Sequence, residues 1–311
     1  MTVTVAVTVD TDNDDVSTAS ERTALSWRSL QLVPSLAALF AELGLAATWF
    51  VRADSQLAEV YGRSDHLLAT HAAWWNAFAA RGDEVGWHPH VYRRDDDGRY
   101  EPETDEGAFV AKLVTTWNEL CERGYCFTSV RVGEAHCTDT VMRAFAGFGL
   151  RVDATAIPGR VRDDADRRFD WGPTPNHPYR PSVADYRVPG EPPYRNLIEV
   201  PLTTMGFRAR YDRRPMLRYV NPAYHADIFR EGIDRHLDGI RRSASNAVLT
   251  MVIHPDEARE HPAQHGLYAH TFDTVRSNLT YLIDAIARSG LTMRTATVRD
   301  VAAAFALEVH R

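Results

Sequence analysis

Two pairs of potential metal ligands each follow an apolar run of the sequence. Asp10 and Asp12 come directly after an alternating series of valines, and His88 and His90 close another apolar stretch. The members of each pair are two residues apart, so in an extended chain both point to the same side. Pro89 favours that extended backbone for His88. Carboxylate and imidazole groups in this combination suit a zinc-type site with an open coordination position.

Two further apolar runs end in residues that could take part in chemistry. Arg131 follows the first run, with Glu134 and His136 close behind it, and His254 directly follows the run LTMVI. Taken alone, His254 indicates a histidine hydrogen-bonded to a neighbouring loop, and a lone aspartate pair indicates a polar turn. The residues at the ends of these four runs can form one site only if the four strands belong to one sheet.

The elements that would position these residues alternate along the chain. The expected strands are Thr2–Val9, Ala46–Val51, Glu84–His88, Ser129–Val132, Arg151–Ala156, Leu197–Leu202, Val248–His254 and Thr292–Ala296. The expected helices are Glu21–Leu43, Asp65–Arg81, Asp105–Arg123, Thr138–Phe148, Pro222–Arg242, Phe272–Ser289 and Val298–Val309. Pro34 is expected to kink or split the first helix. This alternation is typical of an α/β protein with a parallel sheet.

Seven or eight strand–helix units in 311 residues favour one closed (β/α) barrel over an open sheet. We therefore expect a single catalytic domain over residues 1–311. Barrel enzymes carry their sites at the C-terminal ends of the strands, where the four groups above are expected.

Composition excludes several classes of protein. The formal net charge of −7 argues against nucleic-acid binding through a global positive field. No apolar run approaches the roughly 20 residues that cross a bilayer, so no membrane span is expected. The acidic start of the chain lacks a basic signal-peptide region, and three cysteines do not form a disulfide framework. A cytoplasmic location is the resulting expectation; the sequence leaves a homo-oligomer open.

One segment, at about 158–195, interrupts the alternation. It is rich in proline and in aromatic residues, and long segments without regular structure are usually functional or disordered. The aromatic content argues against disorder. Two interpretations stay open: an ordered cover over the barrel edge, or a substrate-binding loop with aromatic platforms and with Arg180, Arg187 and Arg195 as anion ligands.

The ordered set of motifs resembles the polysaccharide deacetylase superfamily, the NodB-homology or carbohydrate esterase family four group. The matching segments are Val9–Asp12, Ala47–Val51, Gly82–His88, Arg131–Gly133 and Val252–Pro255. They occur in the family order and span most of the chain. The resemblance implies a deformed TIM-like barrel of the NodB-homology type.

Two departures from the family pattern indicate a divergent branch. Thr11 separates two aspartates that are usually adjacent, and Tyr92 stands four residues after His88, where the family has its second metal histidine. His90 is the nearest substitute. The implied ligands of one divalent metal ion are Asp12, His88 and His90, with His136 as a further candidate. Zinc is the first choice of metal, with cobalt, nickel, iron or manganese as alternatives.

The resemblance also implies proton-transfer roles in amide hydrolysis. Asp10 would take a proton from water, and His254 would protonate the leaving amine. Arg131 would keep Asp10 ionised through a charge pair.

The expected activity removes an N-acetyl or N-formyl group from a small amino-sugar-containing molecule. Residues expected to contact this substrate are Glu134, His136, Trp171, Tyr179 and Arg180. One alternative is an amidase or imidase that acts on a non-sugar C–N bond, and another is a non-catalytic sugar-binding barrel. The segment His254–Glu257 also resembles a metal motif of an unrelated deacetylase family, but there the motif follows the first strand.

Overall fold

The computed structural model describes residues 1–14, 25–164, 167–194, 196–260 and 266–309. Within them, parallel strands form one curved sheet in the order β10-β7-β6-β3-β2-β1-β13, and β14 also pairs with β1. The strands are β1 (Thr2–Asp10), β2 (Ala47–Arg52), β3 (Glu84–His88), β6 (Ser129–Val130), β7 (Val152–Asp153), β10 (Ile198–Glu199), β13 (Ala247–Ile253) and β14 (Thr292–Thr295).

Strand β1 pairs with three other strands of the sheet, β13, β14 and β2. Its alternating valines are fully buried, and the strand pairs with β13 along its length, from Val3 opposite Ala247 to Val9 opposite Ile253. On its other edge, β14 pairs with the first half of β1 and β2 with the second half. A strand that is buried on both faces tolerates few polar groups, so the polar residues gather where it ends.

The barrel closes without a ladder between its two edge strands, β10 and β13. The segment after β10 bridges the gap instead: the Leu202 N–H donates to the Ala156 carbonyl at 2.9 Å, and the Thr203 N–H donates to the Thr250 carbonyl at 2.9 Å. This confirms the expected fold, a deformed (β/α) barrel whose strands all point their C-terminal ends to one side.

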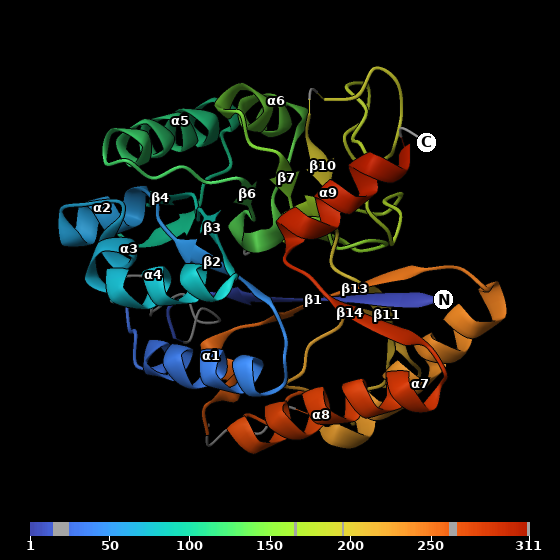
Figure 1. Ribbon diagram of the computed structural model, residues 1–311. Helices are drawn as coiled ribbons and strands as arrows, with labels where there is room; N and C mark the ends of the chain where they lie inside the picture. The colour runs from blue at the N-terminus through green and yellow to red at the C-terminus, as the bar shows by residue number, and fades with distance from the viewer. Residues whose placement is uncertain (15–24, 165–166, 195, 261–265, 310–311) are drawn as a thin grey trace.

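Helices surround the sheet: in Figure 1, α5 and α6 lie above it, α2 to α4 at the left, and α7 and α8 below. The helices are α1 (Val33–Glu42), α2 (Ser55–Tyr61), α3 (His66–Thr70), α4 (Ala72–Arg81), α5 (Glu106–Glu122), α6 (Asp139–Phe148), α7 (Ala226–Ser243), α8 (Phe272–Arg288) and α9 (Val298–Val309). The described residues also form the short 3-10 helices η2 (Ser29–Leu32), η3 (Gly133–Ala135) and η4 (Pro255–Ala258).

Two predicted helices differ from the observed ones. The helix expected over 21–43 begins only at Val33, with Pro34 in its first turn, where a missing N–H costs no hydrogen bond; residues 21–24 lie outside the described residues. The helix expected over 65–81 is two helices that meet at His71, whose φ of −112° is not helical.

Among the described residues, three two-stranded antiparallel pairs lie outside the main sheet. They are β4 (Tyr92–Arg94) with β5 (Tyr100–Pro102), β8 (Val161–Asp163) with β9 (Arg168–Asp170), and β11 (Thr204–Phe207) with β12 (Met216–Tyr219). The second pair belongs to the proline-rich segment 158–195. Its strand β9 contacts the loop after β6, where the His136 ring and the Arg168 carbonyl are 2.9 Å apart.

Among the described residues, no helix is both long enough and apolar enough to span a bilayer.

Candidate metal and catalytic site

The two aspartates at the end of β1 point to the same side because Thr11 keeps the chain extended between them. The Thr11 N–H donates to the Phe50 carbonyl at 3.0 Å, and the Thr11 hydroxyl accepts the Arg52 N–H at 3.0 Å. The chain therefore continues as a strand beyond Asp10, the last residue of β1. Because one residue, Thr11, separates Asp10 from Asp12 in this extended segment, both carboxylates point to the same side.

The two histidines are presented in the same way at the end of β3. His88 is the last residue of the strand, and its carbonyl accepts the Ala53 N–H at 3.3 Å. On the other side, the Pro89 carbonyl accepts the Gly133 N–H at 2.9 Å. Contacts to both neighbours hold this segment extended, so the imidazoles of His88 and His90 are directed to one side.

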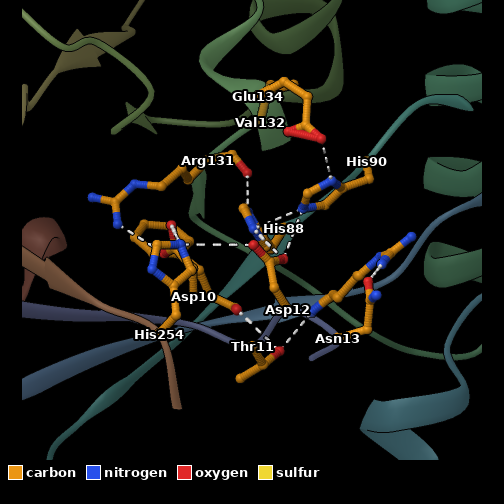
Figure 2. Close-up of polar contacts among 12 residues, drawn as sticks. Asp10, Thr11, Asp12, Asn13, His88, His90, Arg131, Val132, Glu134 and His254 are labelled. Carbon is orange, nitrogen blue, oxygen red and sulfur yellow. Dashed lines mark hydrogen bonds and ion pairs between the residues drawn. The ribbon is translucent and has the colours of Figure 1, made fainter. Parts of the chain in front are cut away.

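Asp12, His88 and His90 meet in a candidate metal site. Asp12 Oδ1 lies 3.1 Å from His88 Nε2 and 2.8 Å from His90 Nε2, and the two Nε2 atoms are 3.1 Å apart. Figure 2 shows the Asp12 carboxylate facing both imidazoles. Of the residues that the structure describes, only these three form such a group, so His136 is not part of it.

The donor set fits a divalent ion. The His88 Nδ1 atom is 2.6 Å from the Arg131 carbonyl, which can only accept a proton, so Nδ1 carries the hydrogen and Nε2 offers its lone pair to the site. Without an ion, the negative charge of Asp12 is balanced by the two histidines, and the positive charge of His90 in its protonated form is balanced by Asp12. Burial disfavours the charge on His90, but Asp12 and Glu134 outweigh it and raise the pKa of His90 to about 9.

Asp10 lies beside this group in an ion pair. Arg131, directly after β6, reaches across the barrel, and its Nη1 is 2.8 Å from Asp10 Oδ1. The guanidinium is fixed by a hydrogen bond from Nε to the Ala154 carbonyl at 2.8 Å and by the Phe50 ring, 4.5 Å away. Asp10 is thus a buried carboxylate next to the metal-ligand group but not part of it.

His254 comes directly after β13, and its ring faces both Asp10 and Asp12 (Figure 2). Its Nε2 is 3.7 Å from Asp12 Oδ2 and 3.9 Å from Asp10 Oδ2, and its Nδ1 is 3.1 Å from Glu257 Oε1. Burial disfavours the imidazolium, but the charge and hydrogen bond of Glu257 dominate and hold the pKa of His254 well above its usual range. The raised pKa favours the protonated form of the His254 ring.

Solved structures share the fold of this chain. The sequence itself matches no protein-family model and no curated protein. The structure is similar to a "putative polysaccharide deacetylase from Mycobacterium smegmatis", with a TM-score of 0.53, 17% identity, and coverage of 98% of this chain and 91% of that chain. The chain has the polysaccharide deacetylase fold. A second similar structure is Puue allantoinase, with a TM-score of 0.52, 14% identity, and coverage of 96% and 89%.

Two residues of this deacetylase fold were not among the predicted site residues. Glu257 accepts the His254 N–H at 2.8 Å, contacts its ring, and is itself held by the Asn221 side chain at 2.7 Å. Tyr92 lies with its hydroxyl 3.1 Å from His90 Nδ1. The sequence did carry a signal for Glu257. A glutamate three residues after the residue that caps a helical turn can accept the backbone N–H of that capping residue, and Glu257 stands three residues after His254.

The residues expected to contact substrate lie in different places. Trp171 is fully buried and donates to the Ala135 carbonyl at 2.9 Å, and Tyr179 is buried with its hydroxyl bonded to the Tyr186 carbonyl at 3.0 Å. The two rings therefore pack the segment onto the barrel. Glu134 and His136 line a cavity of about 80 Å³ next to His90.

The arginines of the proline-rich segment also differ in position. Arg180 lines a separate hollow with Arg151 and Arg299, near the N-terminal starts of β6, β7 and β10. That end of the barrel lies away from the C-terminal ends that carry the metal-ligand group. Arg187 is paired with Asp170 and Asp185. Arg195 lies outside the described residues.

A pair of buried acids lies deeper in the barrel. Asp153 on β7 and Glu199 on β10 are register partners and are both fully buried. Burial raises the pKa of Asp153 to about 6, and burial together with the charge of Asp153 raises the pKa of Glu199 well above its usual range. Two adjacent buried carboxyls do not both ionise at neutral pH, so the pair retains a proton.

Proposed function

We propose that this protein is a metal-dependent amide hydrolase that removes an N-acyl group, acetyl or formyl, from a small amino-sugar-containing substrate. One observation carries the proposal: the Asp12–His88–His90 group has two further ionisable residues beside it, the ion-paired carboxylate Asp10 and the imidazole of His254. Hydrolysis of an amide needs a base for the attacking water and an acid for the leaving amine, and Asp10 and His254 are of the residue types that supply them.

Asp12, His88 and His90 would hold the metal. A divalent ion at such a site polarises a carbonyl group and makes water easier to deprotonate. Asp10 accepts the proton of the attacking water, and its ion pair with Arg131 stabilises the negative charge that makes it a base. His254 donates its Nε2 proton to the leaving nitrogen, and Glu257 stabilises the imidazolium until then.

A second candidate is hydrolysis of a non-sugar amide or imide. It is favoured by the positions of Trp171 and Tyr179, because rings that lie in the core are not free to stack on a sugar. The name of one similar structure, an allantoinase, also denotes a non-sugar substrate. The catalytic residues would keep the roles given above.

The experiment has two parts. First, the bound metal of the purified protein is measured in the wild type and in His88→Ala and His90→Ala; we expect about one equivalent in the wild type and little in the variants. Full retention in both variants would refute the assigned site. Second, release of acetate, formate or ammonia is followed on monomeric and nucleotide-linked N-acyl sugars, chitin oligomers, linear amides and cyclic imides. Turnover of long oligomers alone would refute the small-substrate proposal, and turnover of non-sugar amides alone would establish the second candidate.

A further inference from the structure

The loop after β6 is closely packed against the histidine His90. A Cβ atom built on Gly133 would lie 2.4 Å from both Cε1 and Nδ1 of the His90 ring, closer than any real Cβ contact. Only glycine therefore allows the loop to approach the ring face. The contact is maintained by the hydrogen bond from the Gly133 N–H to the Pro89 carbonyl, one residue before His90.

The next residue, Glu134, has a left-handed backbone with φ 55° and ψ 10°. Such a conformation is strained for a residue with a side chain and persists where the surrounding contacts require it. Here it aims the carboxylate back at the histidine. Glu134 Oε1 accepts the hydroxyl proton of Tyr92 at 2.5 Å and lies 3.6 Å from His90 Nδ1.

Tyr92 connects the two groups. Its ring stacks on His90 at 5.7 Å and its hydroxyl oxygen is 3.1 Å from His90 Nδ1. Because the single hydroxyl proton is donated to Glu134, the tyrosine oxygen can only accept from His90. When the His90 ring is neutral, as a metal ligand must be, its proton is on Nδ1, and Nε2 offers its lone pair toward Asp12 and His88.

We propose that Tyr92 and Glu134 are positioning residues that make His90 a metal ligand: they fix its tautomer and ring orientation through one hydrogen-bonded chain. The inference rests on the proposed function, because it requires that a metal binds at Asp12, His88 and His90. It also explains how a histidine two residues after His88 can serve in place of one four residues after it. The residue that stands at that fourth position, Tyr92, supports the substitute ligand instead of replacing it.

The test measures metal affinity directly. Zinc binding by the wild type, Tyr92→Phe, Glu134→Gln and the double variant is determined by competition with a chromogenic chelator. Loss of a carboxylate or hydroxyl behind a metal histidine typically weakens affinity about 10- to 100-fold. We expect a loss in that range for each single variant. The double variant should lose little more, because the two groups act in series.

A matched control exists on the neighbouring strand. The Tyr100 hydroxyl donates to Glu59 Oε2 at 2.7 Å in a second tyrosine–glutamate pair, on β5 and α2. Tyr100→Phe and Glu59→Gln should leave zinc affinity unchanged. Glu134→Gly separates positioning from general destabilisation: glycine adopts the positive φ without strain, so thermal stability should be retained while zinc affinity falls.

The outcomes distinguish the inference from the proposed function. Wild-type zinc affinity in both Tyr92→Phe and Glu134→Gln, with zinc bound by the wild type at Asp12, His88 and His90, would overturn the inference and leave the proposed function intact. A higher KM with unchanged zinc affinity in Glu134→Gln would also overturn it, because Glu134 would then contact substrate. A wild type that binds no divalent metal at these three residues would overturn both.

Discussion

Replacing Glu257 by glutamine should convert His254 into a poor acid near neutral pH. Glu257 uses both of its oxygens: Oε2 accepts the His254 N–H at 2.8 Å and the Asn221 amide at 2.7 Å, and Oε1 faces the ring nitrogen Nδ1 at 3.1 Å. A glutamine has one oxygen for these three donors. If the glutamine oxygen keeps accepting from the His254 N–H and the Asn221 amide, the glutamine NH2 group faces the ring nitrogen Nδ1. An NH2 group donates to Nδ1 and so favours the neutral ring, which carries its proton on Nε2.

The size of the effect follows from the lost charge. Two unit charges about 4 Å apart interact by about 4 kcal/mol at an effective dielectric constant of 20, which corresponds to about 3 pKa units at 1.36 kcal/mol per unit. The His254 side chain is 23% exposed, so solvent reduces this figure. We therefore expect the pKa of His254 to fall in Glu257→Gln, with a loss of interaction energy smaller than the figure of about 4 kcal/mol.

The assay is the pH dependence of kcat/KM on a substrate that the wild type hydrolyses. A proton donor is active below its pKa, so a lower pKa moves the alkaline limb of the profile to lower pH and activity is lost first at high pH. Titration of the imidazole signals by NMR, with His254→Gln to assign them, measures the same pKa without turnover.

Glu103→Gln is the matched control. Glu103 is also a buried glutamate that accepts backbone N–H groups, from Thr104 and Asp105, and it pairs with Lys112 instead of a histidine. It should leave the alkaline limb unchanged. An unchanged alkaline limb in Glu257→Gln, together with an unchanged His254 titration, would refute the assignment of Glu257 as the group that keeps His254 protonated.

Three further variants test the remaining assignments. Asp10→Asn should keep the metal and lose about 10²- to 10⁴-fold in turnover, because an amide cannot accept a proton; near-normal turnover would mean that another group is the base. Arg131→Met should lower turnover with less loss of metal, since the guanidinium contacts Asp10 but no ligand side chain; equal loss of both would contradict this. Glu199→Gln should reduce the loss of stability with rising pH. In the folded protein the raised pKa of Glu199 keeps a proton on the Asp153–Glu199 pair, whereas in the unfolded chain a glutamate loses its proton above about pH 4.3. The folded state therefore binds more protons than the unfolded state above that pH. Wild-type stability consequently falls as the pH rises from about 4.3 through the folded pKa. Equal changes in melting temperature between pH 5 and 8 in both proteins would refute the shared proton.

Features that depend on local backbone geometry could be predicted from the order of the amino acids. The period of two along an extended chain is set by backbone stereochemistry, so the valines of β1 predicted which side Asp10 and Asp12 share, and Pro89 did the same for the histidine pair. The alternation of strands and helices predicted the parallel barrel, because a helix between two strands lets the second strand run in the same direction as the first. Because parallel strands end on one side, these local patterns were enough to expect the side chains of β1, β3 and β13 in one place.

Contacts between segments far apart in the chain could not be predicted in this way, because they depend on how the barrel folds. Aromatic composition did not distinguish a stacking platform from a core residue, and the packing of residues 158–195 onto the barrel placed Trp171 and Tyr179 inside. Tyr92 meets Glu134 across 42 residues because the β4 hairpin and the loop after β6 both pack against His90. Such contacts follow from how the barrel closes and which surfaces it buries together, and no local pattern around either residue encodes them.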